Sequence, residues 1–210
     1  MPLAGTLNVG AIAICGPTCS GKSTLIRALL GRWPSVFAPI VTTTTRWPRP
    51  GEVPGRDYHF VSRDQFEQYA AHGELVESDE VSGHWYGVRR DELRRLAVSG
   101  RIGVVALTPN GIDPIRTACG ELGRRLVTVY VAASRQVLAM RLLQRYRADR
   151  EVRAMHYARR LLHLLDSQGT WRSAYPYEIV EPDFNARTLE SVVQRIHLAA
   201  APRSMGNHHD

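Results

Sequence analysis

The sequence predicts an α/β fold: a P-loop NTPase-type, mostly parallel sheet with helices on both faces, an inserted lobe and a lid. Strand-like and helix-like segments alternate along most of the 210 residues, as a parallel sheet requires. Between about 37 and 88 this alternation gives way to short β-type pieces separated by turns rich in proline and glycine, which indicates an insertion. We expect one domain, with a core at about 8–36 and 89–199, a lobe at about 37–88, a lid at about 145–153 and a flexible tail at 200–210.

The individual elements follow from hydrophobic patterning and from helix-start signals. Short apolar runs rich in β-branched residues predict buried strands, beginning with the run at 9–15. Ser62, followed three residues later by Gln65, forms a capping pattern that opens a helix. The expected strands are 9–15, 40–44, 58–61, 75–77, 84–86, 102–107, 126–132 and 177–180. The expected helices are 23–30, 63–72, 89–98, 134–144, 154–165 and 189–199.

A phosphate-binding pattern lies between the first strand and the first helix. Residues 16–24 read GPTCSGKST and match G-x-x-x-x-G-K-[ST], in which the glycines let backbone N–H groups surround phosphate oxygens. Lys22 would reach the β- and γ-phosphates, and the Ser23 hydroxyl would bind Mg2+ as the metal ligand. Lys22 is also the only lysine among the 27 lysines and arginines. We expect ATP to bind at Gly16, Pro17, Thr18, Cys19, Ser20, Gly21, Lys22, Ser23 and Thr24.

Composition limits the classes of protein that fit. Hydrophobic residues make up 44% and charged residues 22%, which is typical of a folded globular chain. The net charge of +7 favours anionic partners such as nucleic acid, an acidic membrane surface or small phosphates. Three cysteines are an odd number, which argues against a disulfide framework and for a reducing compartment. No apolar run reaches the length of a membrane span, so we expect a cytoplasmic protein.

A second informative stretch, at 42–60, reads TTTTRWPRPGEVPGRDYHF. Arg46, Arg49 and Arg56 lie close to Tyr58 in a turn-rich segment. Guanidinium groups bind phosphate through paired hydrogen bonds and a tyrosine hydroxyl adds another donor, so this segment could bind a small anion. A solvated basic loop is the alternative interpretation.

With the phosphate loop before it and LVE and GHWYG after it, this stretch resembles the guanylate kinase family, whose members phosphorylate GMP with ATP. The resemblance implies that an acceptor's phosphate is held by Arg46, Arg49, Tyr58 and Tyr86. It also implies that Glu77 binds the guanine edge, with Thr42 nearby and Glu52 supporting the site. A carboxylate can accept from both N1–H and the exocyclic amine of guanine, and adenine offers no such pair of donors.

An arginine-rich connector at 145–153 is the expected lid. Arginines that close over the γ-phosphate stabilise the charge that develops during phosphoryl transfer. By resemblance, Arg145 occupies the position of a lid arginine, and Arg159 or Arg160 that of another at the start of the next helical turn. The expected catalytic groups are Lys22, Arg46, Arg145, Arg159 and Arg160.

The sequence departs from the family pattern after the strand at 102–107. Where the family has D-x-D-x-Q-G, this chain reads ALTPNG, so Ala106 and Thr108 replace two aspartates. By resemblance, the first aspartate organises Mg2+ and the second lies by the acceptor base. Val88 also replaces a small hydroxyl residue that contacts the base. These changes favour slower transfer or an acceptor other than plain GMP.

Three functional hypotheses follow from these observations. The leading one is ATP-dependent phosphorylation of GMP or a closely related guanine nucleotide. The second applies the same chemistry to another phosphorylated acceptor, such as a modified nucleotide or a sugar phosphate. The third is a guanylate-kinase-like binding module without catalysis, although the intact phosphate loop disfavours it. We expect small nucleotides as partners rather than nucleic acid or a membrane, and the sequence leaves the oligomeric state open.

Overall fold

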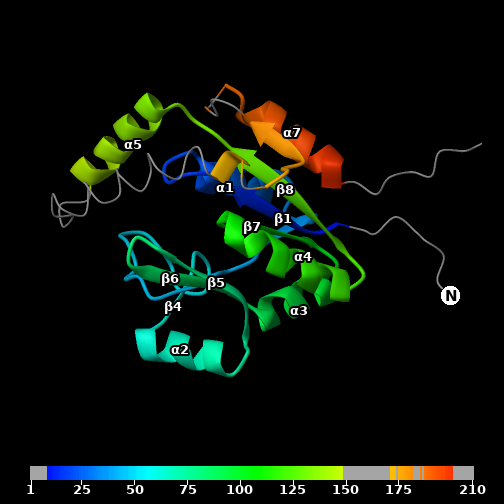
Figure 1. The fold of residues 1–210 in the computed structure, drawn as a ribbon. Coiled ribbons are helices and arrows are strands. Elements are labelled where there is room, and N and C mark those ends of the chain that lie inside the picture. The colour runs from blue at the N-terminus through cyan, green and yellow to red at the C-terminus, as the bar shows by residue number, and fades with distance from the viewer. Residues whose placement is uncertain (1–8, 149–170, 174, 182–184, 186, 201–210) are drawn as a thin grey trace, which may run out of the picture.

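The computed structural model describes residues 9–148, 171–173, 175–181, 185 and 187–200. Its core is a five-stranded sheet in the order β2-β7-β1-β8-β9, and every pair of neighbours is parallel (Figure 1). Ile12 of the central strand lies level with Val104 on one side and with Val127 on the other. The strands are β1 (Val9–Cys15), β2 (Phe37–Pro39), β7 (Ile102–Ala106), β8 (Arg125–Val131) and β9 (Ile179–Glu181).

Helices cover both faces of this sheet. Helices α1 (Lys22–Arg32) and α7 (Leu189–Ala200) pack on one face, and α3 (Arg90–Ser99) and α4 (Ile112–Glu121) lie on the other (Figure 1). Successive side chains of a strand point to opposite faces, so β1 divides its residues between the two layers. Ile12 and Ile14 join the core under α1 and α7, whereas Ala11 and Ala13 join the core under α3 and α4.

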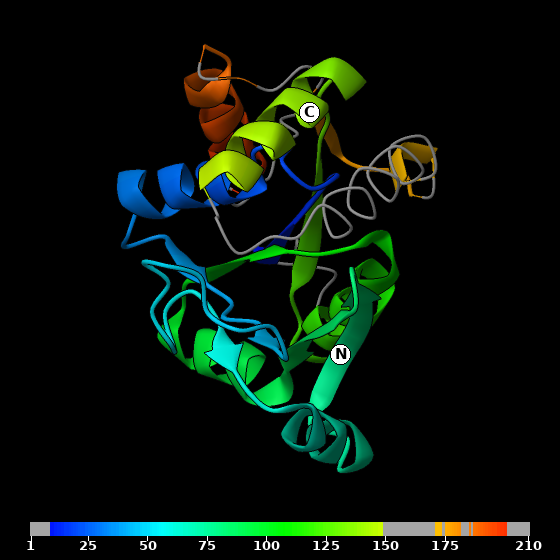
Figure 2. The same ribbon diagram turned by 90° about the vertical axis from the view of Figure 1, so that its left-hand side faces the viewer.

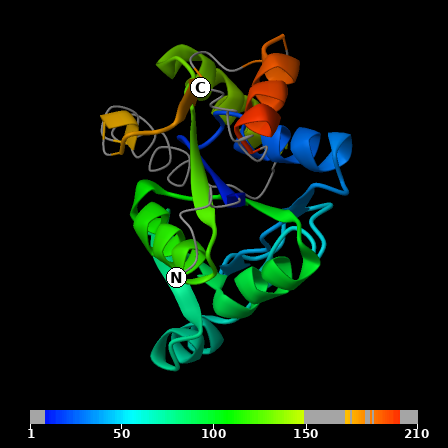
Figure 3. The same ribbon diagram turned by 90° about the vertical axis from the view of Figure 1, so that its right-hand side faces the viewer.

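A second, smaller sheet forms the inserted lobe. Its strands are β3 (Thr43–Thr44), β4 (His59–Phe60), β5 (Leu75–Val81) and β6 (His84–Arg89), in the order β4-β3-β6-β5. Helix α2 (Arg63–Ala71) packs beneath this sheet, at the end of the molecule opposite α7 (Figures 2 and 3). The Ser62 hydroxyl accepts a hydrogen bond from the Gln65 amide, which confirms the predicted cap of α2.

Most of the predicted elements are present, with boundaries shifted by a few residues. The range expected to form the lobe begins with β2, which pairs with β7 in the core sheet. The sequence interpretation missed β2, α4 and the short helix η1 (Pro109–Gly111) before α4. Helix α5 (Arg135–Ala148) extends beyond its expected end at 144, and Ala200, expected to begin the tail, is the buried last residue of α7. The helix expected at 154–165, residues 149–153 of the expected lid and the rest of the tail lie outside the described residues.

No described helix combines the length and apolar character needed to cross a bilayer.

Glu92, at the start of α3, joins the lobe to the core. One of its carboxylate oxygens accepts from the Val41 amide at 3.2 Å and from Arg95 at 2.7 Å. The other lies 3.3 Å from the ring nitrogen of His59 in β4. Burial opposes ionisation of Glu92, but these hydrogen bonds outweigh it and lower the pKa of the carboxyl. Glu92 therefore joins two separate parts of the inserted lobe, the segment before β3 and strand β4, to one buried carboxylate.

Replacing Glu92 with glutamine is expected to lower the free energy of unfolding by about 1–3 kcal/mol, because a single amide oxygen cannot serve all three partners. The loss should shrink in acid, since a carboxyl whose pKa falls on folding contributes stability that disappears as the pH drops through that pKa. Urea titrations of the two proteins at several pH values measure this effect. The matched control is Glu67→Gln, which breaks the exposed Arg63–Glu67 pair and should leave stability nearly unchanged.

Candidate active site

The phosphate loop connects the carboxyl end of β1 to the first turn of α1. Gly16 has φ +142° and Gly21 has φ +109°, both in the range that favours glycine. A Cβ atom on Gly16 would lie 2.3 Å from the Val131 carbonyl oxygen, so no larger residue fits there. The loop therefore turns as the sequence pattern predicts and aims the N-terminus of α1 at the space above it.

Two cationic side chains bind the carbonyl groups of this loop. The Lys22 ammonium donates to the carbonyl oxygens of Gly16 at 2.6 Å and Pro17 at 2.8 Å. Arg141, from α5, donates to the carbonyl oxygens of Cys19 and Ser20, both at 3.2 Å. The carbonyl groups are thus bound on the protein side, which leaves backbone N–H groups for an anion.

One polar atom of the loop is buried without a partner. The Ser20 hydroxyl is fully buried and has no hydrogen-bond partner within the described part of the chain. Ser23, by contrast, lies on the wall of the neighbouring cavity. A fully buried polar atom without a partner costs folding free energy, which is typical of a site arranged for a ligand rather than for stability.

A single cavity of about 570 Å³ connects the phosphate loop with the lobe. Its floor is the phosphate loop and the start of α1, and one wall is formed by the lobe. The opposite wall is the carboxyl end of β7, where ligands bind in open α/β sheets. The lining residues are Thr18, Cys19, Gly21, Lys22, Ser23, Thr24, Thr42, Arg49, Tyr58, Glu77, Asp79, Val81, Ser82, Tyr86, Ala106, Leu107, Thr108, Arg141, Trp171, Asn185 and Leu189.

Several residues that the sequence interpretation proposed for binding an acceptor do lie together here. Thr42, Arg49, Tyr58, Glu77 and Tyr86 all line the cavity, although they come from four separate parts of the lobe. The rings of Tyr58 and Tyr86 meet edge to face with centroids 6.1 Å apart. Burial raises the pKa of the Tyr58 hydroxyl, which keeps it protonated and able to donate a hydrogen bond.

Arg46 and Glu52 lie behind this wall and are absent from the cavity lining. Arg46 is 6% exposed, and one of its nitrogens donates to both carboxylate oxygens of Glu52 at 2.9 Å. Glu52 also accepts from the Arg49 amide at 2.8 Å, and the Arg46 guanidinium lies 5.2 Å from the ring centre of Tyr58. The pair therefore supports Arg49 and Tyr58 from behind.

Glu77 is the most strongly perturbed acid in the cavity. Burial raises the pKa of its carboxyl to about 7, the nearby charge of Asp79 adds to the rise, and a hydrogen bond from the Val88 backbone opposes it. The carboxyl of Glu77 also packs closely against Gly111, where an added Cβ would lie 3.0 Å from one oxygen. A carboxyl poised in this way ionises readily when a ligand brings N–H donors to it.

The three positions that depart from the expected sequence pattern have different surroundings in the structure. Ala106 and Thr108 both line the cavity. The Thr108 hydroxyl donates to Asp79 of β5 at 2.5 Å, and the Asn110 amide donates to the same oxygen at 3.2 Å. Val88 is fully buried in the core under α3 and α4, so its side chain does not line the cavity.

The side chains of the predicted lid arginines are not among the described parts of the chain. Arg145 lies in α5, but its side chain, like Arg159 and Arg160, lies outside the described residues. Sequence reasoning did not assign Arg141, Asp79, Trp171, Asn185 or Leu189 to the site, although all five line the cavity. Only Arg141 carried a signal, because it falls one helical turn before Arg145.

A parallel sheet ending in a glycine-rich phosphate loop, with an inserted lobe across one cavity, defines a P-loop kinase fold. The family model described as guanylate kinase matches residues 9–194, which is most of the chain. The chain belongs to the guanylate kinase family, a family of ATP-dependent nucleoside monophosphate kinases.

Individual relatives agree with this assignment. The chain is 34% identical to a guanylate kinase of Idiomarina loihiensis over 91% of its own length and 87% of that protein. It is 33% identical to a guanylate kinase of Maricaulis maris, over 89% and 81% of the two chains. A match of higher identity, 43% to a guanylate kinase of Nostoc sp., spans only 57% of this chain and 58% of that relative.

A solved structure shares the fold. The crystal structure of guanylate kinase from Anaplasma phagocytophilum aligns with a TM-score of 0.66 and 24% sequence identity, covering 95% of this chain and 89% of that one. At this level of identity the likeness concerns the fold alone.

Proposed function

We propose that this protein transfers the γ-phosphoryl group of ATP to GMP or a closely related guanine nucleotide. The observation that carries the proposal is that one cavity holds both the phosphate loop and the Glu77 carboxyl. A phosphoryl donor and a purine acceptor can therefore meet without leaving the protein. Their alignment supplies much of the catalysis in phosphoryl transfer, where the protein does little covalent work.

The residues of the loop suit a nucleoside triphosphate. Gly16 and Gly21 permit a turn that no larger side chain would allow at Gly16, and Lys22 and Arg141 add positive charge on one side of it. When ATP enters, the Lys22 ammonium exchanges a loop carbonyl for the β- and γ-phosphates. Trp171 and Leu189 provide apolar surface at the same cavity for the donor's base.

Ser23 is the residue that would hold Mg2+. Ser23 lines the cavity, and the described residues contain no group of three or more acidic, histidine or cysteine side chains able to hold a metal. Mg2+ commonly binds through one or two protein oxygens together with substrate phosphates and water, so this sparse set fits it. Bound there, the ion would neutralise charge on the phosphates.

The acceptor would bind across the lobe. Arg49 and the hydroxyls of Tyr58 and Tyr86 would hold its phosphate, with Arg46 and Glu52 fixing these groups from behind. Glu77 would accept from N1–H and the exocyclic amine of guanine. An oxygen of the acceptor's phosphate then attacks the γ-phosphorus, and ADP leaves as the bond to its β-phosphate oxygen breaks.

Water must be kept from the γ-phosphate, since it is a competing acceptor. We place this role on the lobe and on the lid at 145–153, with Arg145 and either Arg159 or Arg160 reaching the transferred group. Thr42 lies where the lobe meets the cavity, and the Glu92 linkage lies directly behind it. A domain with a core, an acceptor lobe and a lid is the arrangement this proposal requires.

The test is ADP release from ATP and Mg2+ with a panel of acceptors: GMP, dGMP, IMP, AMP, CMP, UMP and a phosphorylated sugar. We expect GMP or dGMP to give the highest kcat/KM, because Glu77 pairs with two donors that AMP lacks. Preference for a phosphorylated acceptor without guanine would instead support the same chemistry redirected to another substrate. Tight ATP binding without turnover on any acceptor would support a binding module.

A further inference from the structure

Asp79 is an acidic residue of the cavity that neither the phosphate loop nor the expected acceptor contacts account for. It lies on β5 two residues after Glu77, and side chains two apart on a strand point to the same face. Glu77, Asp79 and Val81 all line the cavity, whereas Ser78 and Glu80 between them are exposed. Two carboxyl groups therefore face the acceptor side of the site from one strand.

Residues from the opposite wall fix the orientation of Asp79. One carboxylate oxygen accepts from the Thr108 hydroxyl at 2.5 Å and from the Asn110 amide at 3.2 Å. The other oxygen accepts from the Glu80 backbone amide at 2.9 Å. A carboxylate can accept about four hydrogen bonds, so three protein donors leave room for one from a ligand.

In this arrangement Asp79 supplies a carboxylate close to Thr108, the position at which an aspartate is missing. The chain has no carboxylate at that position, but the Thr108 hydroxyl holds the carboxylate of Asp79 in the same part of the cavity. The negative charge is thus present and comes from the lobe instead of the end of β7. Ala106, the other departure, also lines the cavity and carries no carboxylate.

We propose that Asp79 determines specificity for the acceptor base by accepting a hydrogen bond from its exocyclic amino group, beside the pair of bonds accepted by Glu77. The inference rests on the proposed function and assigns a further residue to it. Guanine presents N1–H and an amino group with two hydrogens. Glu77 accepts from N1–H and from one amino hydrogen, which leaves the second amino hydrogen for another acceptor. Hypoxanthine has no amino group, so the remaining acceptor position of Asp79 would lose its ligand donor in the closed site, which costs binding free energy.

The experiment compares GMP with IMP, which differ only in the amino group. In Asp79→Ala, the ratio of kcat/KM for GMP over IMP should fall by roughly tenfold, because the selective contact is lost. Adding Thr108→Asp to that variant returns a carboxylate to the cavity from the β7 side, and it should restore much of the ratio. Calorimetric titration with each nucleotide provides the same comparison without turnover.

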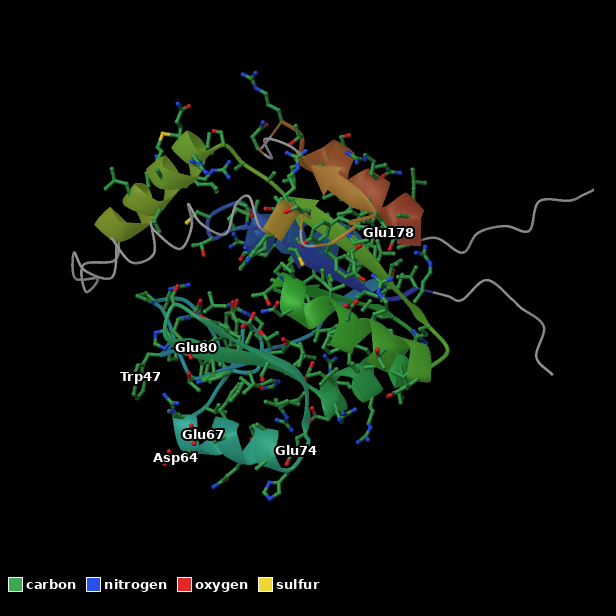
Figure 4. All side chains as sticks on the ribbon, in the orientation of Figure 1. Trp47, Asp64, Glu67, Glu74, Glu80 and Glu178 are labelled. Atoms are coloured by element: carbon green, nitrogen blue, oxygen red, sulfur yellow. The ribbon has the colours of Figure 1, made fainter. Side chains whose placement is uncertain are left out.

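Glu80→Ala is the matched control, since it removes the same charge from the next residue on the exposed face of β5 (Figure 4). It should leave the GMP-to-IMP ratio unchanged. If Asp79→Ala melts at too low a temperature to assay, Asp79→Asn keeps the shape and removes the charge, and the same fall in ratio is expected.

Two results would overturn the inference, and they are distinguishable. If the parent protein prefers GMP but Asp79→Ala lowers activity with both nucleotides equally, Asp79 only supports the wall of the cavity. If the parent phosphorylates neither GMP nor IMP, the proposed function itself is wrong and the role of Asp79 falls with it.

Discussion

Replacing Lys22 with alanine is expected to lower kcat by about 10²–10³, the usual loss when one preorganised donor to a developing charge is removed. The ammonium lies in the phosphate loop on the carbonyl oxygens of Gly16 and Pro17, within reach of phosphates that enter the cavity. Alanine leaves the transferring phosphoryl group without that charge. Steady-state ADP release at saturating ATP and acceptor measures the effect.

Arginine is an informative second replacement at this position. The chain uses arginine for every other strongly basic residue, yet its guanidinium is planar and larger than an ammonium. Lys22→Arg is therefore expected to lose most activity as well. Arg27→Ala, which removes an exposed charge from the same helix, is the control and should retain full turnover. Unchanged kcat in Lys22→Ala would refute the role of the loop in catalysis.

Replacing Glu77 with glutamine is expected to lower kcat/KM for GMP by about 10- to 100-fold, since a hydrogen bond to a charged group contributes roughly 1.5–3 kcal/mol. The loss should be much smaller for acceptors that offer no pair of N–H donors. Phosphate affinity should change little, because Arg49, Tyr58 and Tyr86 remain in place. Kinetics on the acceptor panel measure the change, and an equal loss for every acceptor would make Glu77 a structural residue.

The raised pKa of Glu77 adds a dependence on pH. Below its pKa of about 7 the carboxyl is protonated and accepts fewer hydrogen bonds, so KM for GMP should rise as the pH falls from about 8 to about 6. The phosphate of GMP also titrates in this range, so Glu77→Gln serves as the reference. The pH dependence of KM in that variant should come from the phosphate alone.

The raised pKa of Glu77 should also lower the free energy of unfolding as the pH rises. A carboxyl that ionises less readily in the folded than in the unfolded chain costs stability once the pH exceeds its unfolded value. The parent should therefore lose stability relative to Glu77→Gln as the pH rises from 4.5 to about 7. Parallel thermal melts across this range measure the difference, and a constant difference would contradict the burial of this charge.

The sequence predicted the central strand and the phosphate loop well because both depend on local patterns. The apolar run of β1 predicts a buried strand, and the glycines at 16 and 21 predict a turn with positive φ angles. Helix α4 was missed because Pro114 disrupts its pattern. Proline is tolerated there because it lies in the first turn, where its missing N–H has no partner to lose.

The candidate site was predictable where a motif carried it and not where the fold assembled it. Glu77 and Tyr86 follow from a recognisable segment, but the role of Asp79 depends on Thr108, which is 29 residues away along the chain. Likewise, nothing in the sequence places Arg46 behind Tyr58 rather than in the cavity. Such contacts depend on how β5 meets η1 and how the lobe folds, which local patterns do not specify.

The lysine of the phosphate loop also offers a direct chemical measurement of ligand binding. Lys22 is the only lysine in the chain, so a reagent that acylates primary amines has a single side chain to modify. That amine lies in the cavity where the donor's phosphates would bind. The extent of acylation of one peptide, followed by mass spectrometry, would therefore report how much of the loop is occupied, without a mutation or an attached label.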